Sequence, residues 1–236
     1  MMTTADPVSD HAPVAATAAD VYRPQADTYL LIEALRRLPV TGRRVLDVCT
    51  GAGPVAAASA ELGARSVVAI DTCPRAVATA AALRPTGPAW TCVQATVADF
   101  APAAPFELVT CNPPYVPAPG PGIDCPSPAG PTQAWDAGPD GREVLDALCA
   151  RATALVEPGG SLLLVQSLLA DPAKTAMCLR DDHFGVTEVL RRRIPFGPVL
   201  RSRRSWLVDC GLIGPDQWTE TLCVLLARRE TSEGPR

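Results

Sequence analysis

The segment Asn112-Pro113-Pro114-Tyr115 follows a short apolar run, Phe106 to Cys111, that is typical of a buried strand. Two consecutive prolines fix the backbone and remove two amide donors, which leaves the carbonyl groups of the segment without local competition. The side-chain oxygen of Asn112 and the carbonyl oxygen of Pro113 can then accept both hydrogens of a planar NH2 group. The ring of Tyr115 offers that group a flat face. We predict that this segment holds a planar nitrogen, with Asn112, Pro113 and Tyr115 as its catalytic residues.

A nitrogen held in this way directs its lone pair out of the plane of its group. Reaction with an electrophile on that side then depends mainly on alignment for an in-line displacement. This chemistry needs no histidine base, and the chain contains only His11 and His183. The alternative is a purely structural role, in which the segment is a proline-rich turn and its tyrosine packs in the core.

A second segment whose residues could bind a ligand is the glycine-rich turn that follows the first expected strand, 44–49. Glycines in a turn between a strand and a helix let the backbone approach a cofactor closely. The candidate cofactor-binding residues of this segment are Asp47, Cys49, Thr50, Gly51 and Gly53. A tight turn without a ligand is the alternative interpretation.

Asp71 ends the second expected strand, about twenty residues after the turn, where a carboxylate would meet the two hydroxyls of a ribose. The predicted cofactor-binding set also includes Thr72 beside it, Thr96 after the third strand, and Asn112. These residues fit a dinucleotide nearly as well as S-adenosylmethionine. The nitrogen-holding segment at the end of the fourth strand favours S-adenosylmethionine, whose methyl group that nitrogen can receive.

The elements that position these residues alternate between apolar runs and helix-length stretches, which indicates βαβ units and a mainly parallel sheet. A first helical pattern runs from Tyr29 to Leu38. Strands are expected at 44–49, 66–71, 90–94, 106–111 and 161–166, with an edge hairpin formed by 186–193 and 219–228. Further helices are expected at 54–63, 74–84, 141–156 and 171–182. Residues 112–140 contain too much proline and glycine for regular structure, and long loops of this kind are usually functional or disordered.

Composition sets limits on the class of protein. The chain has 236 residues, a net charge of −4, 47% hydrophobic and 19% charged residues, which fits a globular domain. It lacks an apolar stretch long enough for a membrane helix and a secretory signal, so we expect a cytoplasmic protein. Nine cysteines without a C-x-x-C pair argue against a zinc site or a disulfide framework. We expect flexible tails at 1–20 and 230–236 around one domain at 21–229.

Three motifs in order resemble one known family. Residues Val21 to Thr28, Asn112 to Pro117 and Ala134 to Arg142 look like those of the HemK/PrmC-like glutamine methyltransferases, which are class I S-adenosylmethionine-dependent enzymes. The resemblance covers about residues 21 to 228. It implies a Rossmann-like class I methyltransferase fold with a mostly parallel seven-stranded sheet, helices on both faces and an antiparallel edge hairpin. It also implies methylation of the side-chain amide of a protein glutamine, that of the Gly-Gly-Gln motif in peptide-chain release factors.

Carried over by position, the resemblance implies cofactor contacts at Asp47, Gly51, Gly53 and Asp71, with Asp27 and Thr28 near the methionine end of the cofactor. The substrate-binding residues would be Asn112, Pro113, Pro114, Tyr115 and Trp135. Cys49 stands where the family usually has its first glycine, and Thr96 stands where an acidic residue is often found, with Asp99 three residues later. Because only about twenty residues precede Tyr22, the chain resembles the compact single-domain branch, whose members work with a small partner subunit.

Other functions remain open from sequence alone. The same segment at Asn112 would also hold adenine N6 in nucleic acid, although the acidic charge balance argues against nucleic acid as a partner. A small-molecule N-methyltransferase is a further alternative. A nicotinamide-dependent reductase and a non-catalytic scaffold represent other classes, and the reductase leaves Asn112 to Tyr115 unexplained.

Six arginines lie between positions 191 and 204, at Arg191, Arg192, Arg193, Arg201, Arg203 and Arg204. Such a run could bind a phosphate or an acidic partner. A solvated edge strand that charge protects against aggregation is the more common explanation. We expect the second.

Overall fold

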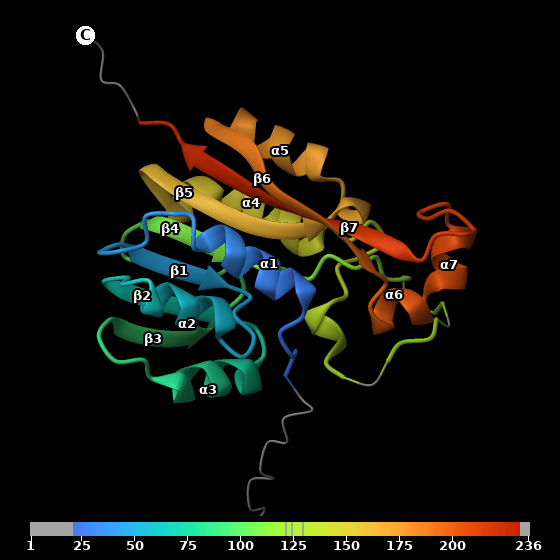
Figure 1. Ribbon diagram of the computed structural model, residues 1–236, viewed down its shortest axis with the longest axis horizontal. Coiled ribbons are helices and arrows are strands. Elements are labelled where there is room, and N and C mark those ends of the chain that lie inside the picture. The colour runs from blue at the N-terminus through green and yellow to red at the C-terminus, as the bar shows by residue number, and fades with distance from the viewer. Residues whose placement is uncertain (1–20, 121, 124, 129, 232–236) are drawn as a thin grey trace, which may run out of the picture.

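The chain forms an α/β fold, shown in Figure 1 as a computed structural model that describes residues 21–120, 122–123, 125–128 and 130–231. The tail predicted at 1–20 and most of the one predicted at 230–236 lie outside these residues. Within the described part of the chain, no helix has the length and hydropathy needed to cross a lipid bilayer. The elements in chain order are α1 (Ala26–Leu35), β1 (Arg44–Val48), α2 (Pro54–Glu61), β2 (Ser66–Asp71), α3 (Pro74–Leu83), β3 (Ala89–Gln94), β4 (Phe106–Cys111), η2 (Thr132–Ala134), α4 (Glu143–Leu155), β5 (Val156–Ser167), η3 (Leu168–Ala170), α5 (Pro172–Asp181), β6 (Phe184–Pro195), α6 (Pro198–Ser202), α7 (Arg204–Asp209) and β7 (Thr219–Arg229).

The seven strands form one sheet in the order β3-β2-β1-β4-β5-β7-β6. The first five are parallel to their neighbours, whereas β7 runs antiparallel to both β5 and β6. The prediction of a mostly parallel seven-stranded sheet with an antiparallel edge hairpin is therefore confirmed. The chain passes from β6 to β7 at the edge, and β7 is the inner strand of that pair.

Helices cover both faces of the sheet, which explains the apolar composition of the central strands. In Figure 1, α1 and α2 lie in front of the sheet, and α4 lies behind it and packs against α5. Helix α4 shows the expected spacing, because its buried residues recur every three or four positions: Leu145, Leu148, Cys149, Ala152 and Leu155. The predicted strands and helices all exist, most of them within a few residues of their expected bounds, although β5 begins five residues earlier than the predicted 161. The short helices η2, η3, α6 and α7 were not expected.

The parallel strands bring the predicted site residues to one edge of the sheet. Strands β1, β2 and β4 are in register side by side, so the turn after Val48, the side chain of Asp71 and that of Asn112 meet beyond their carboxyl ends. Because β7 is antiparallel to β5, its amino end lies at this same edge, with Leu222 opposite Ser167. The beginning of β7 therefore joins the site from the far end of the sequence.

The loop at 112–140 is folded back on itself. The amide of Val116 donates to the carbonyl of Trp135 at 2.9 Å, and the amide of Ala118 donates to that of Gly138 at 2.9 Å. Gly141, with φ of +72°, closes this fold, because a Cβ at that position would collide with the carbonyl oxygen of Tyr115. Apart from η2, the described residues of the loop have no helix, as the proline and glycine content predicts.

The arginine cluster has two different parts, and our prediction of a solvated strand face is correct for only one. Arg191 and Arg192 are exposed on β6 and pair with Glu188 and Glu33. Arg203, between α6 and α7, is only 3% exposed. It donates to the carbonyl of Pro117 at 3.1 Å, to the hydroxyl of Ser127 at 3.3 Å and to the carboxylate of Asp136.

The sequence does not reveal this difference, because a cluster of arginines has the same local pattern whether its side chains are exposed or are covered by a distant segment. Two short helices, each one or two turns long, bring Arg203 under the loop. A buried guanidinium needs several acceptors, and the loop provides them through a carbonyl, a hydroxyl and a carboxylate. Arg203 therefore fastens the loop to the edge of the sheet.

We expect Arg203→Ala to lower the free energy of unfolding by about 2–3 kcal/mol, because it leaves a buried carbonyl unpaired and breaks an ion pair whose aspartate is partly solvated. The matched control is Arg191→Ala, which removes an exposed pair and should cost less than about 1 kcal/mol. Equilibrium unfolding in urea measures both. Equal losses for the two variants would contradict the structural role of Arg203.

Candidate active site

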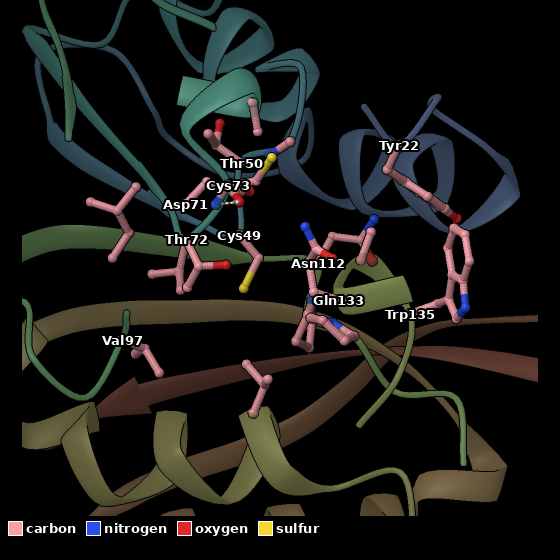
Figure 2. A pocket seen from close by; sticks show the side chains of 18 of the residues that line it. Tyr22, Cys49, Thr50, Asp71, Thr72, Cys73, Val97, Asn112, Gln133 and Trp135 are labelled. Carbon is pink, nitrogen blue, oxygen red and sulfur yellow. Dashed lines mark hydrogen bonds between the residues drawn. The ribbon is translucent and has the colours of Figure 1, made fainter. Parts of the chain in front are cut away.

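A cavity of about 630 Å³, here called the main cavity, opens beyond the carboxyl ends of β1, β2 and β4. Its size is that of a pocket for a small organic molecule. Figure 2 shows the turn after β1 and the side chains of Asp71 and Thr72 toward one end, and Tyr22 and Trp135 at the other. The main cavity brings together every residue predicted to bind cofactor or substrate except Gly53, which does not line it.

The turn after β1 is anchored from below by Asp47. Thr50 Oγ1 and Thr110 Oγ1 each donate to a different oxygen of this carboxylate, both at 2.6 Å. Burial is the main cause that raises the pKa of Asp47 to about 6, and the two hydroxyls oppose that rise. Because both oxygens are engaged and the side chain is buried, the geometry favours a role for Asp47 in holding the turn.

Three positions in the turn have left-handed backbone: Cys49, Gly51 and Gly53. Gly53 has φ of +85°, and a Cβ there would lie 3.1 Å from Ala80 Cβ on α3, which is closer than ordinary van der Waals contact, so glycine fits this position best. Cys49 has φ of +57° although it carries a side chain. Figure 2 shows its sulfur pointing into the main cavity between Thr72 and Asn112. The thiol also lies against that of Cys111, whose pKa burial raises well above its ordinary value.

Asp71 borders the turn from the end of β2. One carboxylate oxygen accepts from the amide of Gly51 at 2.8 Å, and the other accepts from the amide of Cys73 at 2.9 Å. Each oxygen of an ionised carboxylate has a second lone pair, so Asp71 keeps acceptor capacity toward the cavity. The side chain is thereby fixed in position while it can still bind hydroxyls.

Thr96 lies at the same end of the main cavity and donates to Asp99 at 2.7 Å. The backbone amide of Asp99 returns a hydrogen bond to the hydroxyl of Thr96 at 3.0 Å. This small turn places both residues on the cavity wall. In the sequence, Asp99 lies three residues after the position where the family often has an acidic residue. The turn after β3 nevertheless brings its carboxylate to the cavity wall beside Thr96.

Asn112 has one satisfied and one unsatisfied polar atom. Its amide nitrogen donates to Thr28 Oγ1 at 3.2 Å, which fixes the orientation of the side chain. Its Oδ1 is buried and, among the described residues, has no hydrogen-bond partner. A buried acceptor without a partner is rare in folded proteins. Since Pro113 and Pro114 carry no amide hydrogen, the site presents an acceptor that a ligand has to satisfy.

The carboxylate of Asp27, at the start of α1, connects the nitrogen-holding segment to the helix. Asp27 Oδ2 accepts from the hydroxyls of Tyr22 and Tyr115, at 3.0 and 3.1 Å, and Oδ1 accepts from the amide of Thr28 at 2.6 Å. Burial, together with the charge of Asp27, raises the pKa of both phenols above the usual value. The hydroxyl of Tyr115 thus holds the segment in place, a role that our interpretation of its ring alone did not include.

Glu220, at the amino end of β7, is a site residue that sequence reasoning missed. It is only 7% exposed, and burial raises the pKa of its carboxyl to about 7, with a smaller contribution from the charge of Asp27. Its Oε2 has no partner within the described part of the chain. The antiparallel direction of the edge hairpin was the one available signal, because it turns the start of β7 toward the carboxyl edge.

Comparisons with known proteins identify the class of enzyme. Residues 25–112 match the ribosomal protein L11 methyltransferase family (PrmA). A Methanocaldococcus jannaschii protein named for protein N5-glutamine methyltransferase activity is 29% identical over 180 residues, 75% of this chain and 87% of that protein. The release factor glutamine methyltransferase of Rhodospirillum rubrum is 36% identical over 154 residues, 62% of this chain and 47% of that protein. The chain is an S-adenosylmethionine-dependent methyltransferase that is similar to the HemK/PrmC-like enzymes.

The solved structures agree with this assignment at the level of the fold. The chain matches the methyltransferase complex Mtq2-Trm112 of E. cuniculi with a TM-score of 0.58 and 22% identity, over 89% of this chain and 98% of that one. The methyltransferase described here therefore has the Rossmann-like fold that the resemblance implied. Its match to the R. rubrum relative spans about half the length of that protein.

The donor set of the main cavity fits S-adenosylmethionine, the methyl donor of this class. The turn at Gly51 and the carboxylate of Asp71 form a polar end that suits a ribose, and Ile70 and Val97 supply apolar wall for an adenine ring. The unsatisfied oxygen of Asn112 lies away from that end, as Figure 2 shows. The residues present thus suit an adenosine cofactor with a reactive group beside Asn112.

We expect Cys49→Gly to keep cofactor affinity and to stabilise the fold by up to about 1 kcal/mol, because glycine adopts the left-handed backbone without a Cβ clash. Cys49→Leu should lower affinity for S-adenosylhomocysteine at least about tenfold, since a bulky side chain would project into the main cavity. Calorimetric titration measures the affinities. Tight binding by the leucine variant would show that the cofactor lies elsewhere.

The raised pKa of Glu220 should make stability depend on pH. In the unfolded chain this carboxyl loses its proton near its ordinary pKa of 4.5, whereas in the folded protein it keeps it until about pH 7. Folding stability should therefore fall as pH rises between these values and level off above them, by roughly 3 kcal/mol from this group. Glu220→Gln should remove that contribution, measured by urea unfolding at pH 5 and pH 8. Parallel profiles for both proteins would be evidence against a buried, protonated Glu220.

Proposed function

We propose that the methyltransferase transfers a methyl group to the side-chain amide nitrogen of a glutamine in a protein. The observation that carries this proposal is the buried Oδ1 of Asn112, an oriented acceptor without a partner among the described residues, beside a cavity that suits the methyl donor. A primary amide presents two hydrogens in one plane and can satisfy this oxygen and a second acceptor together.

In this proposal Asn112 Oδ1 and the carbonyl oxygen of Pro113 accept the two amide hydrogens of the glutamine. Thr28 keeps the Asn112 side chain oriented through the hydrogen bond to its amide nitrogen. The ring of Tyr115 borders the acceptor, while its hydroxyl is held by Asp27. These residues act by alignment and by excluding water, and the described site requires no histidine.

The cofactor-binding residues of the proposal are those that border the polar end of the main cavity. The Asp71 side chain would accept from the ribose hydroxyls, the backbone around Thr50 and Gly51 would lie against the cofactor, and Thr72 and Thr96 would border it. Bound S-adenosylmethionine supplies an electrophilic methyl group on a sulfonium. Asp47 and Gly53 would support the turn from outside the ligand.

A glutamine of a peptide-chain release factor is the acceptor that the relatives support. Two of them are named release factor glutamine methyltransferase, and they are 36% and 37% identical over their matched residues. The Gly-Gly-Gln motif places its glutamine in a glycine-containing loop, which can enter a narrow site. Adenine N6 and a small amine are the competing acceptors, and the net charge of −4 is unfavourable for nucleic acid.

We further propose that a small activating subunit binds this methyltransferase. The support is the E. cuniculi structure, described as a complex of Mtq2 with Trm112, one chain of which shares the fold over 98% of its length. Copurification of the tagged chain from its own cells, followed by mass spectrometry of small partners, tests this. Full activity of the purified chain alone would overturn it.

The acceptor is tested by incubating the protein with S-adenosylmethionine labelled in the methyl group and with purified release factor. We expect label in the release factor and, by peptide mass spectrometry, on the glutamine of its Gly-Gly-Gln motif. A release factor with that glutamine changed to alanine is the control. Label in nucleic acid or in a metabolite fraction, with none in the release factor, would overturn the proposed acceptor.

We expect Asn112→Ala to keep affinity for S-adenosylmethionine within about twofold, because Asn112 is proposed to hold the acceptor. Its rate of methyl transfer should fall about 10²-fold or more, since an oriented acceptor is lost from a site that works by alignment. Asp71→Ala is the matched comparison and should weaken cofactor binding first. Calorimetry and single-turnover transfer separate the two effects. Transfer by Asn112→Ala at the parent rate would refute the assignment of the segment.

A further inference from the structure

A second cavity of about 540 Å³, here called the side cavity, lies next to the main cavity. The two share a wall that includes Tyr22, Asp27, Tyr115 and Trp135. Its other walls come from the end of β6, from α6 and from the beginning of β7. None of the cofactor-binding or amide-binding roles proposed above uses this space.

Two residues that line the side cavity carry buried polar atoms of opposite kind without partners. Trp135 Nε1 is a donor, on a side chain that is 8% exposed, and Glu220 Oε2 is an acceptor, on a side chain that is 7% exposed. Neither has a hydrogen-bond partner among the residues that the structure describes. Buried polar atoms are nearly always paired, so an unpaired donor and an unpaired acceptor on two residues that line the same cavity point to a ligand that supplies both partners.

The chemistry of the wall restricts that ligand. A phosphate or carboxylate would lie near the carboxylate of Asp27 and the carboxyl of Glu220, where burial already disfavours negative charge, and a simple cation would leave the indole N–H of Trp135 unpaired. Much of the remaining lining is apolar, including Val116, Ile194 and Val199. A neutral amide, which carries one donor and one acceptor, satisfies both open atoms.

We propose that the side cavity binds a main-chain peptide unit of the substrate protein, next to the residue that is methylated. Its N–H would donate to Glu220 Oε2, and its C=O would accept from Trp135 Nε1. This inference rests on the proposed function. It assumes that the acceptor glutamine binds in the main cavity and that the adjoining residues of the substrate protein reach the side cavity. A peptide fits better than a small-molecule acceptor because a peptide is long enough to reach both cavities at once.

The assignment makes Glu220 and Trp135 determinants of substrate length. An acceptor that ends at the glutamine gains nothing from the side cavity, whereas a longer peptide gains two hydrogen bonds there. The two residues should therefore affect the long acceptor more than the short one. A general disturbance of the active site would lower transfer to both acceptors equally.

The test compares two acceptors: a ten-residue peptide centred on the glutamine of the Gly-Gly-Gln motif, and acetylglutamine methylamide. For each variant we would measure kcat/KM for both acceptors and take the ratio of long to short. Trp135→Phe keeps an aromatic ring but loses the N–H, and Glu220→Leu loses the acceptor. Each should lower the ratio about tenfold, which corresponds to one hydrogen bond. Glu220→Gln retains an accepting oxygen and should lower it less.

Trp218→Phe is the matched control for the tryptophan, because Trp218 is 56% exposed, packs against Arg204 and lines neither cavity. Its ratio should equal that of the parent. A second readout does not need catalysis. In protein labelled with ¹⁵N at its four tryptophans, the long peptide should shift the indole resonance that Trp135→Phe removes.

The outcomes separate the two proposals. If the unaltered protein transfers no methyl group to the long peptide or to the release factor, the proposed function fails before any variant is compared. If transfer occurs but Trp135→Phe and Glu220→Leu keep the parent ratio, or the indole resonance does not move, the side cavity is not a peptide site and the proposed function stands. A lower ratio with a shifted resonance supports the inference.

Discussion

The carboxylate of Asp27 joins the two segments between which a ligand has to bind. It accepts hydrogen bonds from Tyr22, before α1, and from Tyr115, at the end of the nitrogen-holding segment. Hydrogen bonds to a charged group are stronger than neutral ones, and burial removes competing water. Because the pKa of each phenol is raised, both remain donors across the physiological range. Together with the hydrogen bond from Asn112 to Thr28, this carboxylate fixes the Asn112 segment relative to helix α1, and it forms part of the wall between the two cavities.

The long loop after β4 illustrates how a segment with little regular structure becomes a fixed part of a site. Arg203 connects the beginning of the loop to its later part through Pro117 and Asp136. Just after the loop, the buried Arg142 binds Asp146, the carbonyl of Asp171 and the hydroxyl of Thr175. Both arginines are almost completely enclosed. Such support by surrounding groups is what allows an oriented amide acceptor to keep its geometry without a rigid helix or strand beneath it. The loop therefore belongs to the scaffold as much as to the site.

The sequence was sufficient for the sheet and for the residues at the ends of its parallel strands. Val48, Asp71 and Asn112 are found at one edge because strand order and direction follow from the βαβ pattern. It was insufficient wherever a role depends on packing between distant segments. Glu220 lies far along the chain from Asp27, and nothing local marks its burial. Arg203 was placed with exposed arginines for the same reason, and the hydroxyl of Tyr115 has a partner 88 residues away.

The position of β7 inside the sheet has a consequence for how the chain is made. Synthesis proceeds at about 5–20 residues per second, and β5 and β6 leave the ribosome before β7. Until β7 arrives, these two strands cannot pair with each other in the final order, and each presents an open row of backbone groups. The nascent protein is then most vulnerable to pairing with another chain, and a molecular chaperone that shields strand edges would act in this interval. Completion of the sheet also brings Glu220 to the site, so ligand binding has to wait for the same event.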